Sequence, residues 1–137
     1  MAYMGPVKRW DLFWVNLEPH VGSEQGGEQR PAIVVSNDGV NASLDVVTVL
    51  PATKLTGKKR RVYPFEVVLP VGFITHEHES IIMPQQIRTI PKMRLLEKIG
   101  QLNDPDQQRT IENRLLEHLG IQFEAEELGD YQLSLTA

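Results

Sequence analysis

The chain has 137 residues, of which 41% are hydrophobic and 23% are charged, with a formal net charge of −4 and no cysteine. This length fits one domain with a single core, and the lack of cysteine excludes disulfides and thiolate metal ligands. No apolar run approaches the roughly 18 residues that span a bilayer, and the opening MAYMGPVKRW has no signal-peptide core. We therefore expect a cytoplasmic protein with no membrane segment.

The charge is distributed unevenly along the chain. Residues 121–137 contain four acidic residues and no Lys or Arg, and the rest of the chain has equal numbers of acidic and basic residues. Five positive charges gather in the segment KLTGKKRR: Lys54, Lys58, Lys59, Arg60 and Arg61. An acidic partner is therefore electrostatically possible at this segment despite the negative net charge.

The first two thirds of the chain predict β-strands. Residues 9–17 (RWDLFWVNL) are apolar on both alternating sets of positions, which predicts a strand buried on both faces. The β-branched runs 31–36 and 44–50 predict two more strands, joined by a turn at Asn37-Asp38-Gly39. Further strands are expected at 62–69, 80–83 and 86–90, with Pro64 at an edge or a bulge.

The period then changes and predicts helices. Residues 92–99 (KMRLLEKI) suit a short helix that ends at Gly100. A second helix begins after Asp104 as N-cap, with Pro105 at its first position, and ends at Gly120; its apolar positions are Ile111, Leu115 and Leu119. We expect an α+β, β-dominated fold: one small barrel domain over residues 1–120 with C-terminal helices.

Residues 121–137 are expected to form an acidic tail outside this domain. The tail is either disordered or docked through its few apolar residues, Phe123, Leu128, Tyr131 and Leu133. The sequence leaves these two alternatives open.

Several common kinds of site are missing from the sequence. His76 and His78 lack the further ligands of a metal site, and we expect neither a metal nor a cofactor. The chain has no P-loop or nucleophile-elbow motif, and the glycines of 22–27 precede a strand instead of a helix, which argues against a dinucleotide site. What remains is a set of arginine, hydroxyl, carboxylate and amide side chains.

These polar residues lie at the ends of predicted strands. Arg30, where the glycine-rich loop meets a strand, presents a planar fork of donors suited to a phosphate. Thr53 follows another strand beside Lys54, and Glu24 and Gln25 lie on the loop. Their spacing of two places Gln86 and Arg88 on the same side of their predicted strand.

The order of these pieces resembles the MazF/PemK family of toxins. The segment WDLFWVNLEPHVGSEQGGEQRPAIVVSND is similar to the opening of that family, VLPATK to its second motif, and YPFEVVL and QQIRTI to its third and fourth. The resemblance spans about residues 8–100. Each piece is a weak signal, but four in the right order are specific.

The resemblance implies a homodimeric, SH3-like β-barrel of the MazF/CcdB type with helices at the periphery. It implies a metal-independent, sequence-specific endoribonuclease that cuts single-stranded RNA, and a cognate antitoxin that lays an acidic, apolar peptide along the RNA groove. By the resemblance, Arg30 matches the catalytic arginine, Thr53 the catalytic hydroxyl residue and Glu24 the loop acid.

The sequence departs from the family pattern at three places. Two residues, Glu28 and Gln29, stand between the second glycine and Arg30, where the family usually has one. Gln85 replaces an Asp that is common before the Gln of the fourth motif, and Trp10 stands where a glycine is common. None of these changes removes a residue that the resemblance assigns to chemistry.

RNA carries its own nucleophile, so an enzyme of this kind needs to align the 2′-hydroxyl and stabilise the phosphorane. The predicted RNA-binding residues are Gln25, Lys54, Lys58, Lys59, Arg60, Arg61, Gln86 and Arg88. Two alternatives remain: a non-enzymatic barrel toxin that poisons DNA gyrase, and an inactive barrel that only binds RNA or an antitoxin. For the basic segment the alternative is a solvated hairpin tip.

Overall fold

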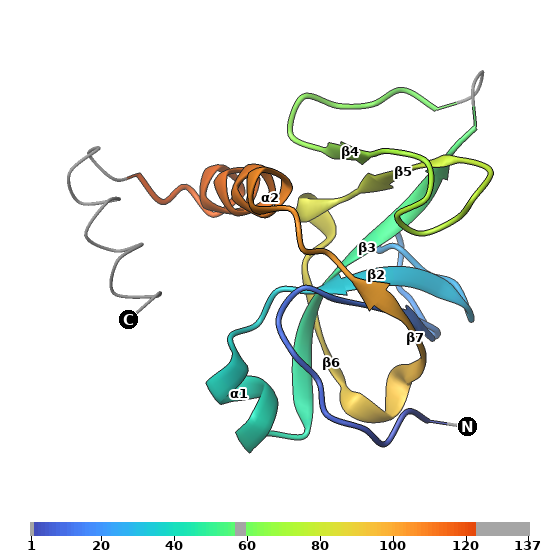
Figure 1. The fold of residues 1–137 in the computed structure, drawn as a ribbon, viewed down its shortest axis with the longest axis vertical. Coiled ribbons are helices and arrows are strands. Elements are labelled where there is room, and N and C mark those ends of the chain that lie inside the picture. The colour runs from blue at the N-terminus through green and yellow to red at the C-terminus, as the bar shows by residue number, and fades with distance from the viewer. Residues whose placement is uncertain (1, 57–59, 123–137) are drawn as a thin grey trace.

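The computed structural model describes residues 2–56 and 60–122. Within these ranges lie seven strands, two α-helices and two short 3-10 turns, labelled η1 and η2 (Figure 1). In chain order they are β1 (Asp11–Val15), β2 (Arg30–Val34), α1 (Asp38–Ser43), β3 (Val46–Leu55), β4 (Val67–Leu69), β5 (Glu79–Ile82), η1 (Pro84–Gln86), β6 (Arg88–Pro91), η2 (Lys92–Arg94), β7 (Leu95–Gln101) and α2 (Pro105–His118).

The long strand β3 organises the sheet. The strands run antiparallel in the order β4-β5-β3-β2-β1-β7, and β6 pairs with the first half of β3 while β5 pairs with its second half. In Figure 1, β3 crosses the centre of the molecule between the β4–β5 end and the α1 end. The α+β, β-dominated class is confirmed. Strand pairing within the described ranges does not close a ring, so the barrel is an open one.

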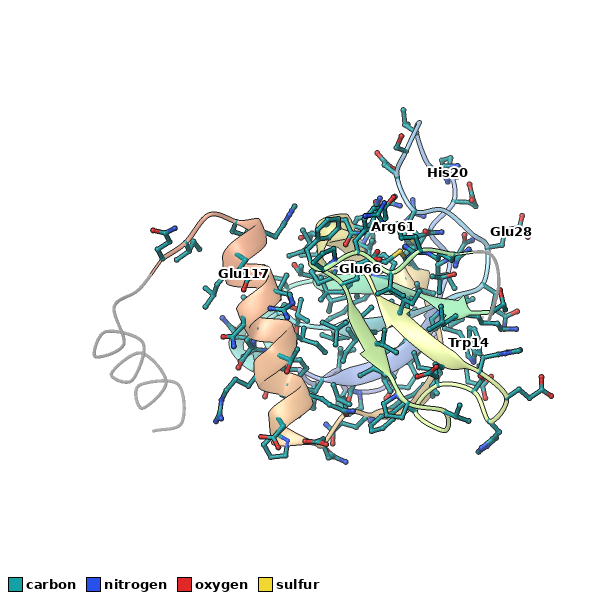
Figure 2. All side chains as sticks on the ribbon, turned by 90° about the horizontal axis from the view of Figure 1, so that it is seen from above. Trp14, His20, Glu28, Arg61, Glu66 and Glu117 are labelled. Atoms are coloured by element: carbon teal, nitrogen blue, oxygen red, sulfur yellow. The ribbon has the colours of Figure 1, made fainter. Side chains whose placement is uncertain are left out.

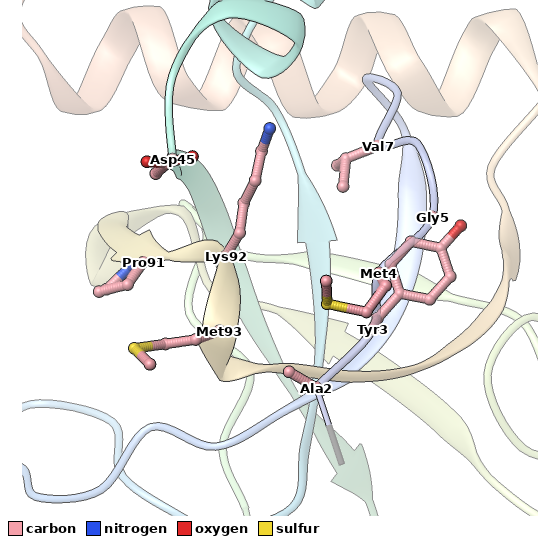
Figure 3. A pocket seen from close by; sticks show the side chains of 9 residues that line it. All are labelled: Ala2, Tyr3, Met4, Gly5, Val7, Asp45, Pro91, Lys92 and Met93. Carbon is pink, nitrogen blue, oxygen red and sulfur yellow. The ribbon is translucent and has the colours of Figure 1, made fainter.

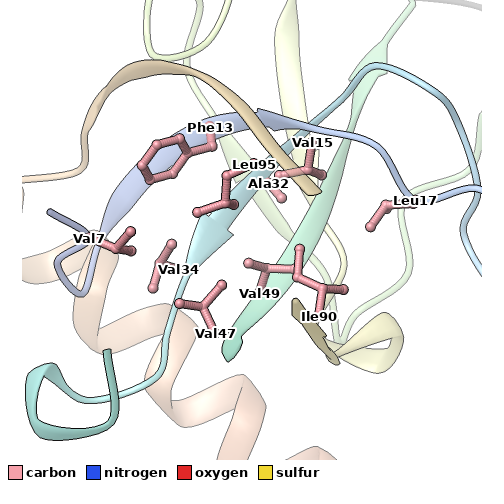
Figure 4. Close-up of a cluster of buried hydrophobic side chains, with 10 residues drawn as sticks. All are labelled: Val7, Phe13, Val15, Leu17, Ala32, Val34, Val47, Val49, Ile90 and Leu95. Carbon is pink, nitrogen blue, oxygen red and sulfur yellow. The ribbon is translucent and has the colours of Figure 1, made fainter. Parts of the chain in front are cut away.

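The inner strands are buried on both faces, as the sequence of 9–17 predicts. Successive residues of β1, β2 and β3 enter two different apolar clusters, because side chains of a strand alternate between its faces. The first cluster (Figure 4) contains Phe13, Val34 and Val49, and the second contains Leu12, Ile33 and Leu50. Each such fully buried side chain stabilises the fold by about 1.5–3 kcal/mol.

The second helix is confirmed in both of its ends. The carboxylate of Asp104 accepts from the backbone N–H of Asp106, and Gly120 adopts φ 70° just after the helix ends. Ile111 and Leu115 pack on the second cluster, whereas Leu119 is 55% exposed and does not join it. Neither described helix is both long and apolar enough to cross a bilayer.

The expected helix at 92–99 is wrong. Residues 92–94 form the 3-10 turn η2, and β7 then pairs with β1 through Leu95 opposite Val15. A short apolar run does not distinguish a helix from a strand by its period alone. Here the backbone groups on the free edge of β1 decide the outcome, because they need hydrogen-bond partners.

Three other local expectations also need correction. The turn at 37–39 is the start of α1, with the side chain of Asn37 accepting from Val40 N–H at 2.9 Å. The strand expected at 62–69 is limited to β4, and Pro64 lies before it, since proline cannot donate to the ladder. Gln86 lies in η1 and not in the strand with Arg88, because Pro84 begins a 3-10 turn closed by the Ile87 N–H to Pro84 oxygen bond.

Trp10 explains one departure from the family pattern. Its φ of 75° is a left-handed conformation that glycine adopts without strain and other residues seldom adopt. The indole packs against the second cluster, and the Arg9 guanidinium carbon lies 4.7 Å from the ring centroid. The backbone at Trp10 is therefore strained, and the packing of the indole offsets part of this strain.

Candidate active site

Arg30 is the first residue of β2 and lies half-buried where the glycine-rich loop ends. Its Nε donates to the Gly26 carbonyl at 2.8 Å, and its Nη1 approaches the Ala52 carbonyl at 3.4 Å. Burial lowers the pKa of the guanidinium below its ordinary value. Among the described residues, both hydrogen-bond partners are neutral carbonyls, so the positive charge is not matched by a carboxylate.

Arg30 and Thr53 lie just beyond the same end of the β2–β3 ladder. This ladder ends at Ala32 and Pro51, and Arg30 and Thr53 each lie two residues further along their strands. Thr53 lies within β3 and not after it, and it pairs there with Ile81 of β5. The Arg30 Nη1 lies 3.4 Å from the carbonyl of Ala52, the residue before Thr53. The fold therefore brings the two predicted catalytic residues into the same region from two separate motifs.

The glycine-rich loop is fitted closely around Arg30. Gly27 has φ 129°, and a Cβ placed there would stand 3.1 Å from the Arg30 Nε. A residue with a side chain would therefore strain the backbone and press on the guanidinium. This is the physical reason for a glycine at this position of the loop.

Gln86, which lies in η1, forms two hydrogen bonds with this loop. Its Oε1 accepts from Gln25 N–H at 3.0 Å, and its Nε2 donates to the Ser23 carbonyl at 3.0 Å. The Glu24 carboxylate lies 3.9 Å from the Arg88 Nη1, which also donates to the Leu17 carbonyl. A hollow of about 160 Å³ is lined by Glu24, Gln25, Gln86, Ile87 and Arg88. Four of the predicted site residues thus share one hollow.

Sequence reasoning missed a set of contacts at the base of the loop, here called the Glu18–His20 clamp. The Glu18 carboxylate accepts from Gly27 N–H at 2.6 Å and contacts His20 Nδ1 at 2.7 Å. The hydrogen bond with His20, followed by that with Gly27, holds the Glu18 pKa below its ordinary value. The available signal was an acid two residues before a histidine in the quoted opening motif.

The basic segment does not act as one group. Arg60 makes a bidentate pair with the Glu66 carboxylate, with both N–O distances 2.8 Å, and the Glu66 side chain is fully buried. Lys54 and Arg61 are exposed. Lys58 and Lys59 lie outside the described residues. Arg60 is therefore charge-compensated, and Lys54 and Arg61 are the exposed cations of this segment within the described residues.

Burial and pairing have opposite effects on Glu66. Desolvation raises its pKa, but hydrogen bonds from Arg60, the Tyr63 backbone N–H and Gln85 together bring it below the ordinary value. The same pairing raises the pKa of Arg60. Both groups are therefore held charged.

A larger hollow than the one beside the loop lies elsewhere on the described surface. Its volume is about 460 Å³, and Figure 3 shows the residues that line it: Ala2, Tyr3, Met4, Gly5, Val7, Asp45, Pro91, Lys92 and Met93. None is a predicted site residue, and the Lys92 ammonium donates to the Asn41 carbonyl. Size therefore does not identify the active site here.

Comparison with known proteins places the chain in a family. Residues 8–119 match the family described as PemK-like, MazF-like toxin of type II toxin–antitoxin system. Over 98 residues the chain is 40% identical to the endoribonuclease EndoA of Bacillus subtilis (strain 168), covering 72% of this chain and 82% of that protein.

Solved structures of MazF and of a related endoribonuclease have the same fold as this chain. MazF from Deinococcus radiodurans superposes with a TM-score of 0.70 at 26% identity, covering 86% of this chain and 100% of that one. A mycobacterial endoribonuclease in complex with its cognate antitoxin superposes with a TM-score of 0.67 at 18% identity, covering 88% and 100%. The chain belongs to the family of PemK-like, MazF-like toxins of type II toxin–antitoxin systems.

Proposed function

We propose that Arg30 and Thr53 catalyse the cleavage of single-stranded RNA in this chain. The chain is a toxin of the type II class with endoribonuclease activity, as its family and its curated relative indicate. The observation that supports the assignment is that the Arg30 guanidinium contacts the carbonyl of Ala52, next to Thr53, and that among the described residues its hydrogen-bond partners are neutral carbonyls.

The reaction needs no nucleophile from the protein. The 2′-oxygen of the RNA forms a bond to phosphorus while the bond to the 5′-oxygen breaks, which leaves a 2′,3′-cyclic phosphate and a 5′-hydroxyl. Arg30 stabilises the negative charge on the phosphorane, and the Thr53 hydroxyl donates to a non-bridging oxygen. No step in this scheme calls on a metal ion.

Two protons must move during this step. Glu24 takes the proton of the 2′-hydroxyl, and Arg30 supplies a proton to the leaving 5′-oxygen. Burial lowers the pKa of Arg30 and so favours its part as the donor. Glu24 is exposed on the loop, beside the hollow that it shares with Gln86, so an RNA strand can reach it.

The hollow beside the loop suits one base of the substrate. Gln25, Gln86 and Arg88 offer amide and guanidinium groups that can pair with a base edge, and unpaired bases expose those edges. Lys54, Arg61, Lys58 and Lys59 attract the RNA backbone, whereas Arg60 contributes less because Glu66 compensates its charge.

We also propose that the protein acts as a homodimer and is neutralised by a cognate antitoxin with an acidic, apolar segment. The mycobacterial endoribonuclease of the same fold is found in complex with its cognate antitoxin. The Arg30 guanidinium, which contacts no carboxylate among the described residues, offers a site for an acidic peptide. Since RNA and antitoxin meet in the cytoplasm, we place the protein there.

One assay separates this function from the two alternatives, the gyrase poison and the inactive barrel. The full chain is mixed with a long single-stranded RNA in EDTA, and the fragment ends are mapped. We expect cuts at discrete positions with 5′-hydroxyl ends. Intact RNA, or loss of cutting in EDTA with recovery on adding Mg²⁺, would contradict the proposal.

A further inference from the structure

We propose that the side chains of Arg61, Tyr63 and Phe65, here called the aromatic platform, stack against one unpaired base of the RNA, away from the bond that is cut. This inference rests on the proposed ribonuclease function and adds a second contact with the same substrate. The proposed function uses Arg61 only as a charge that attracts the RNA backbone, and it gives no role to Tyr63 or Phe65.

The platform is a column of flat groups. The Tyr63 and Phe65 ring centroids are 5.1 Å apart with an interplanar angle of 7°, and the Arg61 guanidinium carbon lies 5.5 Å from the Tyr63 centroid. Both rings are 41% exposed. Unpaired bases stack on aromatic faces, and a cation in the column strengthens binding of a polyanion.

A buried carboxylate holds the platform in place. The segment has no regular secondary structure, yet Glu66 accepts from Tyr63 N–H at 3.0 Å and from both terminal nitrogens of Arg60. Gln85 Nε2 adds a fourth donor atom at 2.7 Å. The backbone that carries the Tyr63 ring is therefore held in place before RNA arrives, which lowers the ordering cost of binding.

A hollow of about 270 Å³ adjoins Phe65 and is also lined by Gln85, Glu117 and His118. It lies below the roughly 300–1,000 Å³ of sites for drug-sized ligands, which favours a single base. The buried Gln85 Oε1 has no hydrogen-bond partner among the described residues. Adenine, cytosine and guanine each carry an amino group that could donate to it. Arg114, 3.2 Å from Glu117, compensates the nearby negative charge.

The turn η1 connects this hollow with the catalytic loop. Gln85 donates to Glu66 below the platform, and the next residue, Gln86, fastens the loop of Gln25. In the view of Figure 2, Arg61 and Glu66 lie between α2 and the loop that carries His20. One RNA strand can therefore cross η1 and contact both places. The cation over the ring favours RNA over an apolar protein segment as the occupant.

The test measures RNA binding separately from cleavage. The full chain binds an RNA that carries a 2′-deoxy nucleotide at the mapped cut site and so cannot be cleaved. We expect Phe65→Leu to bind about tenfold more weakly, because stacking on one ring is lost. Phe65→Trp should bind like wild type. Leu44→Ala, at a residue 51% exposed beside α1, is the control that should not change affinity.

A second series identifies the base. Each base in turn is removed to leave an abasic site. At one position, removal should weaken wild-type binding as much as Phe65→Leu does, and the two changes together should cost no more than either alone. If the affinity losses from Phe65→Leu and from base removal multiply at every position, or if Phe65→Leu binds RNA like wild type, the proposed stacking is wrong. Tyr63→Leu, which removes the other ring of the platform without changing a charge, replaces Phe65→Leu if that variant unfolds.

The outcomes separate this inference from the function on which it rests. If wild type cuts RNA at discrete sites but Phe65→Leu binds RNA normally, the platform is wrong and the function stands. If Phe65→Leu instead weakens self-association or antitoxin binding and leaves RNA binding intact, the occupant is a protein and the inference fails. If wild type does not cut RNA, the function itself fails.

Discussion

Two arginines of this molecule show how the same side chain serves two different purposes. Arg60 faces the buried carboxylate of Glu66 in a bidentate pair, whereas Arg30 contacts two neutral backbone carbonyls. The charge of Arg60 is compensated inside the protein, so its effect is on the fold. The charge of Arg30 has no such partner among the described residues, and so it is available to an anion from outside.

The largest expected effect comes from removing the available charge. Arg30→Ala should reduce the single-turnover cleavage rate by about 10²–10³-fold, the usual loss when one oxyanion donor is removed. The matched change Arg60→Ala should leave the rate within about threefold at saturating RNA, because its guanidinium points to Glu66. Equal losses in the two variants would abolish the distinction between the arginines.

The next effect sharpens the geometry around Arg30. Gly27→Ala should lower the cleavage rate by about tenfold, since its Cβ presses on the Arg30 Nε and a displacement of about 1 Å can cost about 10². Gly22→Ala is the control, because Gly22 lies in the same loop with φ 56° and has open space where a Cβ would stand. It should cut RNA at nearly the wild-type rate; a loss as large as that of Gly27→Ala would contradict the close fit at Arg30.

A third change tests the structural arginine. Glu66→Gln should lower the free energy of unfolding by about 1–3 kcal/mol, because a partly buried guanidinium and its hydrogen bonds lose their charged partner. Urea unfolding measures this. Arg30→Ala should unfold close to wild type, since its guanidinium has no ion pair among the described residues.

The smallest effect is the response to acid. The pKa of Glu66 and that of Glu18 are both below the ordinary 4.5, so each contributes stability that is fully present above pH 4.5. That stability is lost as the pH falls through the folded-state pKa values. Below pH 4.5 the unfolding free energy of Glu66→Gln should therefore fall less steeply than that of wild type. If the unfolding free energies of wild type and Glu66→Gln fall in parallel below pH 4.5, Glu66 is not held charged in the folded protein.

The sequence predicts the parts of this molecule that local pattern controls. Runs that are apolar on both faces identify β1, β2 and β3, and the Asp104-Pro105 start and Gly120 end identify α2. Arg30 and Thr53 are found through motif order, and in the structure both lie just beyond the same end of the β2–β3 ladder. Their catalytic roles stay a prediction.

What the sequence does not reveal depends on long-range pairing. The sequence of residues 92–99 predicts a helix because its periodicity carries no information about β1, the distant strand with which these residues pair. The sequence predicts Arg60 as an RNA contact because the neighbouring residues do not indicate that Glu66 is buried and forms an ion pair with it. The Glu18–His20 clamp is missed for the same reason, since its partner Gly27 lies nine residues away on the returning side of the loop.

The most direct test of the account measures Arg30 and Thr53 as a pair. Single-turnover cleavage in EDTA is compared among wild type, Arg30→Ala, Thr53→Val and the double variant, with thermal unfolding as the check on the fold. If both groups act on one phosphorane, the double variant should cut little more slowly than Arg30→Ala alone. Losses that simply multiply, or wild-type cutting by Arg30→Ala, would show that the two side chains do not form one catalytic unit.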